Sequence, residues 1–163
     1  MDESEFKVFY ETHAKPLWSY VYRLTKDEAL ADDIVQESFV RYLNRELFFL
    51  TESQKKSYIY QTATNIVKDH WRKSKRMVSW EDTDDVLESN GANTDNKVDF
   101  EQAFNQLSPR YQSLLWLAYA EDYRHEEIAD ILKIKTHSVK VLLFRAKKRM
   151  SDILKELGIK GEF

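Results

Sequence analysis

Two clusters of basic residues are the features of this sequence whose types and spacing suit binding chemistry. Residues 68–76 carry five Lys and Arg against Asp69, and residues 133–149 carry seven with no acid. Such clusters bind nucleic-acid phosphates, because each neutralised phosphate releases a condensed counterion. The formal net charge of −3 hides both clusters, since residues 81–101 carry eight acids and only Lys97 as a base. The charge distribution therefore indicates nucleic-acid binding at two separate points.

A third group of polar residues could form an acidic contact surface or hold a metal ion. It consists of Asp32, Asp33, Gln36 and Glu37. At helical spacing these side chains make a ridge suited to charge-assisted bonds with a basic partner, although a merely solvated acidic face has the same pattern. Their carboxylates could instead hold Mg²⁺ in a phosphoryl-transfer enzyme or nuclease.

The enzyme alternative lacks the motifs that such chemistry needs. The sequence has no Gly-rich phosphate loop, and its four His show no HExxH-type pairing. Without any Cys it has no disulfide, no thiolate nucleophile and no Cys-based zinc site. We therefore expect no enzyme, no metal, no cofactor and no small-molecule substrate.

Apolar residues at steps of three and four predict three helices in the first half of the chain. The predicted helices cover residues 6–24, 27–44 and 57–73. Asp27 is a suitable N-cap for the second helix, and Pro16 predicts an interruption of the first. Residues 45–57 break the pattern and indicate a loop with room for a short helix. Three such helices make a compact helical domain.

The second half of the chain begins with an acidic segment that has no helical periodicity. Residues 78–100 are rich in Asp, Glu, Asn, Ser and Thr, so they bury too little apolar area to offset the entropy of ordering. We expect a flexible linker there. Periodicity returns at Phe100, and Ser108 followed by Pro109 predicts the start of a helix that runs to about Glu121.

The last part of the chain has the layout of a helix-turn-helix: a short helix, a brief turn and a longer basic helix. The predicted ranges are 125–132, 133–135 and 136–157. Thr136 is expected to cap the long helix and Gly158 to end it.

The long basic helix is the candidate DNA-reading element. Val139, Leu143 and Ala146 should face the core, which leaves the other faces for DNA. Basic side chains near the start of such a helix meet guanine acceptors in the major groove, and apolar ones meet thymine methyls. The candidate contacts are Thr136, His137, Ser138, Lys140, Val141, Phe144, Arg145, Lys147 and Lys148. We expect the last two to contact phosphate; a solvated helix with a basic end is the alternative.

Three segments together resemble the extracytoplasmic-function (ECF) sigma factors of RNA polymerase. They are ADDIVQESFVRYL, SYIYQTATNIVKDHWRKSKR and LSPRYQSLLWLAYAEDYRHEEIADILKIKTHSVKVLLFRAKKRM. The first is similar to the clamp-binding helix of sigma domain 2, the second to the adjoining promoter-recognition helix, and the third to sigma domain 4. The resemblance implies an all-α chain of two small domains, with domain 2 at 1–77, the acidic linker at 78–100 and domain 4 at 101–158.

The resemblance also implies a function and a set of partners. The chain would bind core RNA polymerase and direct promoter recognition and opening. Domain 2 would bind the clamp helices of the beta-prime subunit and open the −10 element, while domain 4 would bind the beta flap and read the −35 element. An anti-sigma factor is a further expected partner. We expect the chain to be cytoplasmic. An anti-sigma factor anchored in the inner membrane would hold it at that membrane.

Residue by residue, the resemblance implies contacts in the first domain. The segment that binds core polymerase comprises Asp32, Asp33, Gln36, Glu37, Phe39, Val40 and Arg41. The −10 contacts are Asn65, Lys68, Trp71, Arg72, Lys73, Lys75 and Arg76. Asn65 matches the edge of the pocket for a flipped −10 base, and its amide could instead bond locally to backbone. Trp71 could stack on a base or lie in the core. The loop of roughly 46–57 matches the segment that varies with promoter specificity.

Some positions depart from the family pattern. Arg124 stands where Ser or Thr is common, which gives the short helix a weak cap. Val141 and Leu142 stand where polar or basic residues are common, so this helix offers fewer polar base contacts. A stand-alone helix-turn-helix regulator is the alternative function, but such a protein has no need of DDIVQESF beside a second basic helix.

Overall fold

The computed structural model describes residues 3–45, 47, 49–74, 80 and 100–158, and its elements in that part of the chain are all helices. They are α1 (Glu3–Thr25), α2 (Glu28–Asn44), α3 (Glu52–Ser74), α4 (Phe100–Asn105), α5 (Pro109–Leu115), the π-helical segment η2 (Trp116–Ala120), α6 (His125–Leu132) and α7 (Thr136–Glu156). Two compact units result, one of α1 to α3 and one of α4, α5, η2, α7 and the start of α6. The predicted all-α class is confirmed.

The exact domain boundaries remain predictions. Most of the predicted linker, 78–100, lies outside the described residues. Of its two described residues, Phe100 begins α4, and Trp80 is buried with 2% of its surface exposed. A buried Trp shows that this position does not behave as solvated chain.

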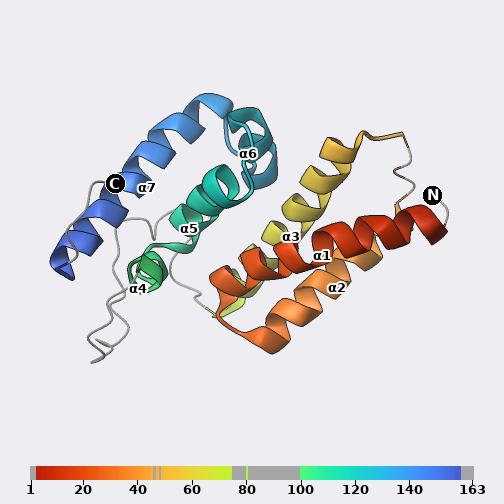
Figure 1. Ribbon diagram of the computed structural model, residues 1–163, viewed down its shortest axis with the longest axis horizontal. Coiled ribbons are helices and arrows are strands. Elements are labelled where there is room, and N and C mark those ends of the chain that lie inside the picture. Colours follow the sequence, from red (N-terminus) through yellow and green to blue (C-terminus); the bar gives the residue numbers. More distant parts are fainter. Residues whose placement is uncertain (1–2, 46, 48, 75–79, 81–99, 159–163) are drawn as a thin grey trace. The chain divides into compact units, whose positions relative to one another are not determined.

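In the first unit α1, α2 and α3 pack against one another (Figure 1). Its core contains fully buried side chains from every helix, among them Leu17, Tyr20, Ile34, Ile59 and Tyr60. The polar part of Tyr20 is satisfied inside this core, because its hydroxyl lies 2.8 Å from Oγ1 of Thr64.

Helix α1 is continuous, so the interruption predicted at Pro16 is wrong. Proline removes one backbone donor and usually kinks a helix. Here Phe9 before it and Leu17, Tyr20 and Val21 after it are all buried on the face of α1 that packs on the unit. Tertiary packing on both sides of Pro16 therefore maintains a single helix.

Aromatic rings fill the end of this unit where α1 begins and α2 ends. Phe9 stacks on Tyr42 with a centroid distance of 4.6 Å, and Phe39 lies edge-on to Phe9 at 6.0 Å. Tyr42 is 1% exposed. Burial, together with the carboxylates of Glu52 and Glu5, raises the pKa of its phenol to about 12.

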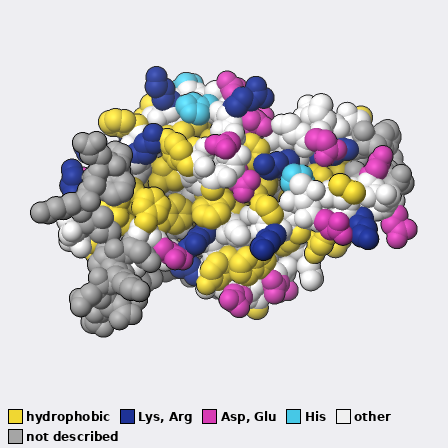
Figure 2. Space-filling model, in the orientation of Figure 1, with side chains coloured by type: hydrophobic (Ala, Val, Ile, Leu, Met, Phe, Trp, Pro, Cys, Tyr) yellow, Lys and Arg dark blue, Asp and Glu magenta, His cyan; other side chains and the backbone are white. Residues whose placement is uncertain are grey.

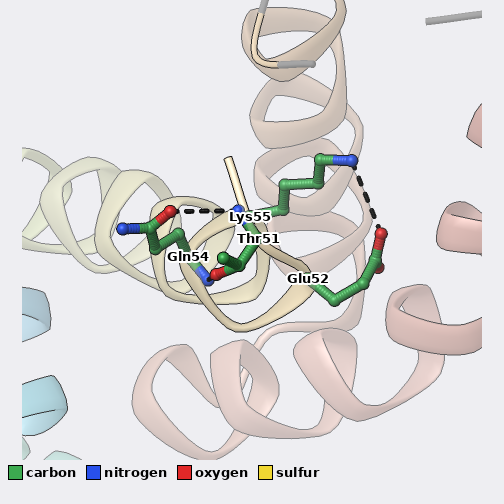
Figure 3. Close-up of polar contacts among 4 residues, drawn as sticks. All are labelled: Thr51, Glu52, Gln54 and Lys55. Atoms are coloured by element: carbon green, nitrogen blue, oxygen red, sulfur yellow. Dashed lines mark hydrogen bonds and ion pairs between the residues drawn. The ribbon is translucent and has the colours of Figure 1, made fainter. Parts of the chain in front are cut away.

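Helix α3 begins earlier than the sequence analysis expects. Thr51 and Gln54 form a capping box: the Thr51 hydroxyl accepts from the Gln54 N–H at 3.1 Å, and Gln54 Oε1 accepts from the Thr51 N–H at 3.0 Å (Figure 3). Glu52 and Lys55 add an ion pair at 3.4 Å. The loop predicted at 45–57 therefore ends at Thr51, and residues 52–57 are helical.

In the second unit Ser108 caps α5 as predicted, accepting from the Tyr111 N–H at 3.2 Å, with Pro109 at the first helical position. The helix widens into η2 after Leu115, and the Glu121 N–H reaches back to the carbonyl of Trp116 at 3.1 Å. The core contains fully buried Leu114, Leu117, Ile128 and Ile153.

Candidate nucleic-acid interface

Helix α7 presents the predicted DNA-facing residues at the surface. Val139, Leu143 and Ala146 are buried as expected, and Leu142 joins them at 7% exposed. Ser138 is half-buried, and the other predicted contacts are exposed. Val141 and Phe144 are the unusual members, because they are large apolar side chains with 49% and 69% of their surface in solvent. An exposed apolar pair beside Lys140 and Arg145 suits contact with thymine methyls.

The start of α7 differs in one respect from the prediction. Lys135, and not Thr136, is the N-cap, and it makes no side-chain capping bond. The turn before it is closed by the Ile134 N–H, which donates to the Ala129 carbonyl at 3.0 Å, and Lys133 takes a left-handed backbone with φ 57°. These contacts join α6 to α7 as a helix-turn-helix.

Helix α6 compensates for its unusual cap residue. The Arg124 N–H donates to Oε1 of Glu127 at 3.0 Å, and its guanidinium Nε donates to the same oxygen at 3.2 Å. Glu127 thus makes one half of a capping box, whereas Arg124 has no side-chain oxygen that could accept from the first-turn N–H groups. The weak cap expected at position 124 is therefore only partly compensated.

The basic end of α7 includes a contact with η2. The ammonium of Lys147 lies 4.7 Å from the centroid of the Tyr119 ring, which is 56% exposed. This cation–π contact holds one of the two predicted phosphate ligands in place while leaving it at the surface.

The predicted −10 contacts lie along the second half of α3. Asn65 and Trp71 are half-buried, and Arg72 and Lys73 are exposed in the last turn. Arg72 pairs with Asp69 at 3.2 Å. Lys68 is a correction to the predicted −10 contacts: its side chain is 7% exposed, and its ammonium donates to a backbone carbonyl at 3.2 Å, so it offers no surface to DNA. Lys75 and Arg76 fall outside the described residues. The helix therefore brings Asn65 and the exposed Arg72 and Lys73 to one element.

The acidic ridge forms on α2 and is already bonded within the unit. Asp33, Gln36 and Val40 are exposed. Asp32 Oδ1 accepts from the Trp18 indole N–H at 2.7 Å, and Glu37 pairs with Arg41 at 2.9 Å. In the described part of the chain no group of three or more His, Cys, Asp or Glu could hold a metal ion. The ridge therefore matches a protein-contact surface better than a metal site.

Phe39 is a correction to the predicted polymerase-binding segment. Its ring is 3% exposed and contacts Phe9 and Tyr10, with a centroid distance of 4.8 Å to Tyr10. A side chain that is buried among aromatic rings offers no surface to a partner. We assign Phe39 to the core of the first unit.

Basic residues outside the predicted set also lie beside α7. Arg110 of α5 and Lys135, with Arg145, line a depression of about 410 Å³. Arg110 lies outside both basic clusters of the sequence, so no local pattern indicates it. On the face drawn in Figure 2, Lys and Arg lie among acidic and hydrophobic side chains, so no field of one sign covers that face.

Comparison with protein families agrees with this two-unit architecture. Residues 9–77 match the model described as Sigma-70 region 2, and residues 97–150 match Sigma-70, region 4. A sigma factor of Bartonella quintana, RpoE, solved in complex with the anti-sigma factor NepR, has the same fold. Its TM-score is 0.71 at 23% identity, over 93% of this chain and 97% of that one. The fold and its two regions thus define a sigma-70-type transcription factor.

Curated relatives narrow the class. The RNA polymerase sigma factor SigV of Bacillus subtilis is 30% identical over 139 residues, covering 85% of this chain and 84% of that protein. The ECF RNA polymerase sigma factor SigM of the same organism is 26% identical over 151 residues, covering 88% and 91%. SigL of Mycobacterium tuberculosis is 28% identical over 161 residues, covering 94% and 90%. The chain belongs to the ECF RNA polymerase sigma factors.

Proposed function

We propose that this ECF sigma factor binds core RNA polymerase and directs it to promoters, where it recognises and opens the DNA. One observation supports this most strongly: each of the two units that match sigma-70 regions ends in a basic helix with exposed Lys and Arg. A stand-alone regulator needs one such helix and no second region. None of the helices in the described residues is long and apolar enough to span a membrane.

In this proposal the second unit contacts the −35 element through α7. Lys140 and Arg145 bond to base edges, and Val141 and Phe144 contact thymine methyls. Thr136, His137 and Ser138 lie at the groove-entering end of the helix, and Lys147 and Lys148 contact phosphates. In the first unit, Asn65 bonds a −10 base, and Trp71, Arg72, Lys73, Lys75 and Arg76 contact the surrounding strand.

The acidic ridge would hold core polymerase. Asp33, Gln36 and Glu37 present acceptors to basic clamp residues of the beta-prime subunit, and Val40 adds exposed apolar area beside Arg41. Asp32 is fixed by its bond from Trp18, which holds the carboxylate in one position. The second unit would bind the flap of the beta subunit.

An anti-sigma factor is the third proposed partner. The RpoE of Bartonella quintana, which shares this fold, was solved with its anti-sigma factor NepR. We place the chain in the cytoplasm, where core polymerase acts, or at the inner membrane when such a partner is anchored there.

Promoter binding measured with and without core polymerase tests this proposal against a stand-alone regulator. The chain alone should bind labelled promoter DNA weakly, and core should raise its affinity at least about tenfold. Asp33→Lys combined with Glu37→Lys should abolish that gain, because it reverses the ridge. Glu11→Lys, which changes an exposed acid of α1, is the matched control and should keep it. Tight binding by the chain alone, unchanged by core, would favour a regulator.

A further inference from the structure

The acidic ridge on α2 receives a hydrogen bond from a different helix. The indole N–H of Trp18, on α1, donates to Oδ1 of Asp32 at 2.7 Å. The indole ring is held on its own helix, because it stacks on Tyr22 with a centroid distance of 5.0 Å and an interplanar angle of 6°. Trp18 is half-buried and Asp32 is exposed. A fixed aromatic donor therefore holds one oxygen of an accessible carboxylate.

This hydrogen bond orders Asp32 without neutralising it. An indole N–H is an uncharged donor, so the carboxylate keeps its full negative charge, and its Oδ2 atom can accept a further bond. Glu37 of the same ridge differs, because it pairs with the guanidinium of Arg41 at 2.9 Å. A basic partner that bonds to Glu37 must compete with Arg41, whereas Asp32 is bonded to an uncharged group.

Folding stability accounts poorly for the contact between Trp18 and Asp32. A hydrogen bond to an exposed carboxylate adds little to the free energy of unfolding, since water competes for both groups. Binding provides a stronger reason. A side chain loses rotamer freedom when it enters an interface, and a side chain that is already held in place avoids that cost. The arrangement therefore suits a carboxylate that is ordered in advance for a basic partner group.

We propose that Trp18 is a positioning residue for polymerase binding, which presents Oδ2 of Asp32 to a basic side chain of the core enzyme. The inference rests on the proposed function and deepens it, because it extends the binding machinery from α2 to α1. Trp18 acts through Asp32 and needs no contact of its own with the polymerase.

The test measures the affinity of the full chain for core RNA polymerase without DNA. Trp18→Phe keeps an aromatic ring beside Tyr22 but removes the N–H donor, so it should lower affinity by about threefold to tenfold, the cost of ordering one side chain. Its salt dependence should stay that of the wild type, because Asp32 keeps its charge. Asp32→Asn should lower affinity and also weaken the salt dependence. Tyr10→Phe, which removes the hydroxyl of an exposed ring on the same helix, is the matched control and should match the wild type.

A double-mutant cycle separates positioning from a merely structural role. In the Asp32→Asn background Trp18→Phe should have little further effect, because the charge that the indole positions is gone. In the Glu37→Gln background Trp18→Phe should still lower affinity by its full factor, because Glu37 pairs with Arg41 and not with the indole. A loss caused by looser packing of α1 on α2 would instead have the same size in both backgrounds.

Three results would overturn the inference. They are a wild-type affinity for Trp18→Phe, equal losses in the two backgrounds, and a wild-type affinity for Asp32→Asn. The last result decides the question even where Trp18→Phe lowers the melting temperature, because it tests the exposed carboxylate directly. In each case core binding by the wild type would leave the proposed function intact. Failure of the wild type to bind core polymerase would instead contradict the proposed function itself.

Discussion

Neighbouring residues on α3 have different tasks. Thr64 is fully buried and bonds to Tyr20 and to the Tyr60 carbonyl, whereas Asn65 is half-buried and retains access to solvent. One step along the helix thus separates a packing residue from a candidate base contact. The geometry leaves Asn65 able to act in base recognition without supporting the core.

Asn65→Ala should change the preference at one base of the −10 element while leaving core binding intact. In the proposed role the amide bonds one base edge, so its loss should cost about 1–3 kcal/mol at that position only. Promoter variants substituted one base at a time measure this, with Gln61→Ala, one turn earlier on α3, as the control. Equal loss on every promoter variant would argue against the role.

Replacing Lys147 and Lys148 by Ala should flatten the salt dependence of promoter binding. Each phosphate contact displaces about one counterion, so the slope should shrink by about 2. Tyr119→Leu, which removes only the ring under Lys147, should have a smaller effect, because the charge remains. An unchanged slope in the double variant would place both lysines outside the interface.

Tyr42 makes stability depend on alkaline pH. The folded state raises its pKa from 10.0 to about 12, so the folded chain keeps a proton that the unfolded chain loses. The associated stability is complete below pH 10 and is lost as pH rises toward 12. Tyr42→Phe should remove about 1–2 kcal/mol of this pH dependence of the free energy of unfolding. Denaturant unfolding of the wild type and Tyr42→Phe from pH 9 to pH 12 measures this. A free energy of unfolding that changes with pH by the same amount in both proteins would contradict the prediction.

At the residue scale the sequence predicted the faces of α7 well, because Val139, Leu143 and Ala146 follow a regular spacing. It failed at Phe39, which lies inside a segment that resembles a partner-binding helix. Helical spacing places Phe39 beside Ser38 and Tyr42 on the buried face of α2. The periodicity therefore indicated a core position, whereas the family resemblance indicated a partner contact. Arg110 had no local signal, because only the fold brings it to α7.

Most differences between the predicted and the observed helices lie at the helix ends. The pattern Thr51-x-x-Gln54 is a capping box in the sequence, yet Lys55, Lys56 and Ser57 interrupt the apolar pattern that follows it. Periodicity alone therefore placed the start of α3 too late. The widening into η2 leaves the apolar spacing intact, so it could not be predicted.

Thr51→Ala should destabilise the first unit by about 1 kcal/mol, because the Gln54 N–H loses its acceptor. Thermal or denaturant unfolding measures the change. Glu11→Ala, at an exposed position of α1, is the control and should change stability by less than about 0.5 kcal/mol. Equal effects of the two substitutions would show that the Thr51 cap does not stabilise the first unit.

For the whole molecule, the distribution of basic and acidic residues along the chain matters more than the net charge of −3. Two basic helices on separate units allow one chain to bind a promoter at two points, and neither needs to be tight alone. In the proposed function the acidic ridge would bind core polymerase, so promoter binding would depend on the polymerase. The two basic clusters and the acidic segment between them make this division visible in the sequence.

The most direct measurement is transcription from mapped start sites by core polymerase reconstituted with this chain. The account predicts that the wild type starts transcripts at a defined set of promoters, that core alone does not, and that Asp33→Lys with Glu37→Lys abolishes them. Association with core that yields no promoter-specific transcript, or transcripts that persist in the ridge variant, would contradict it.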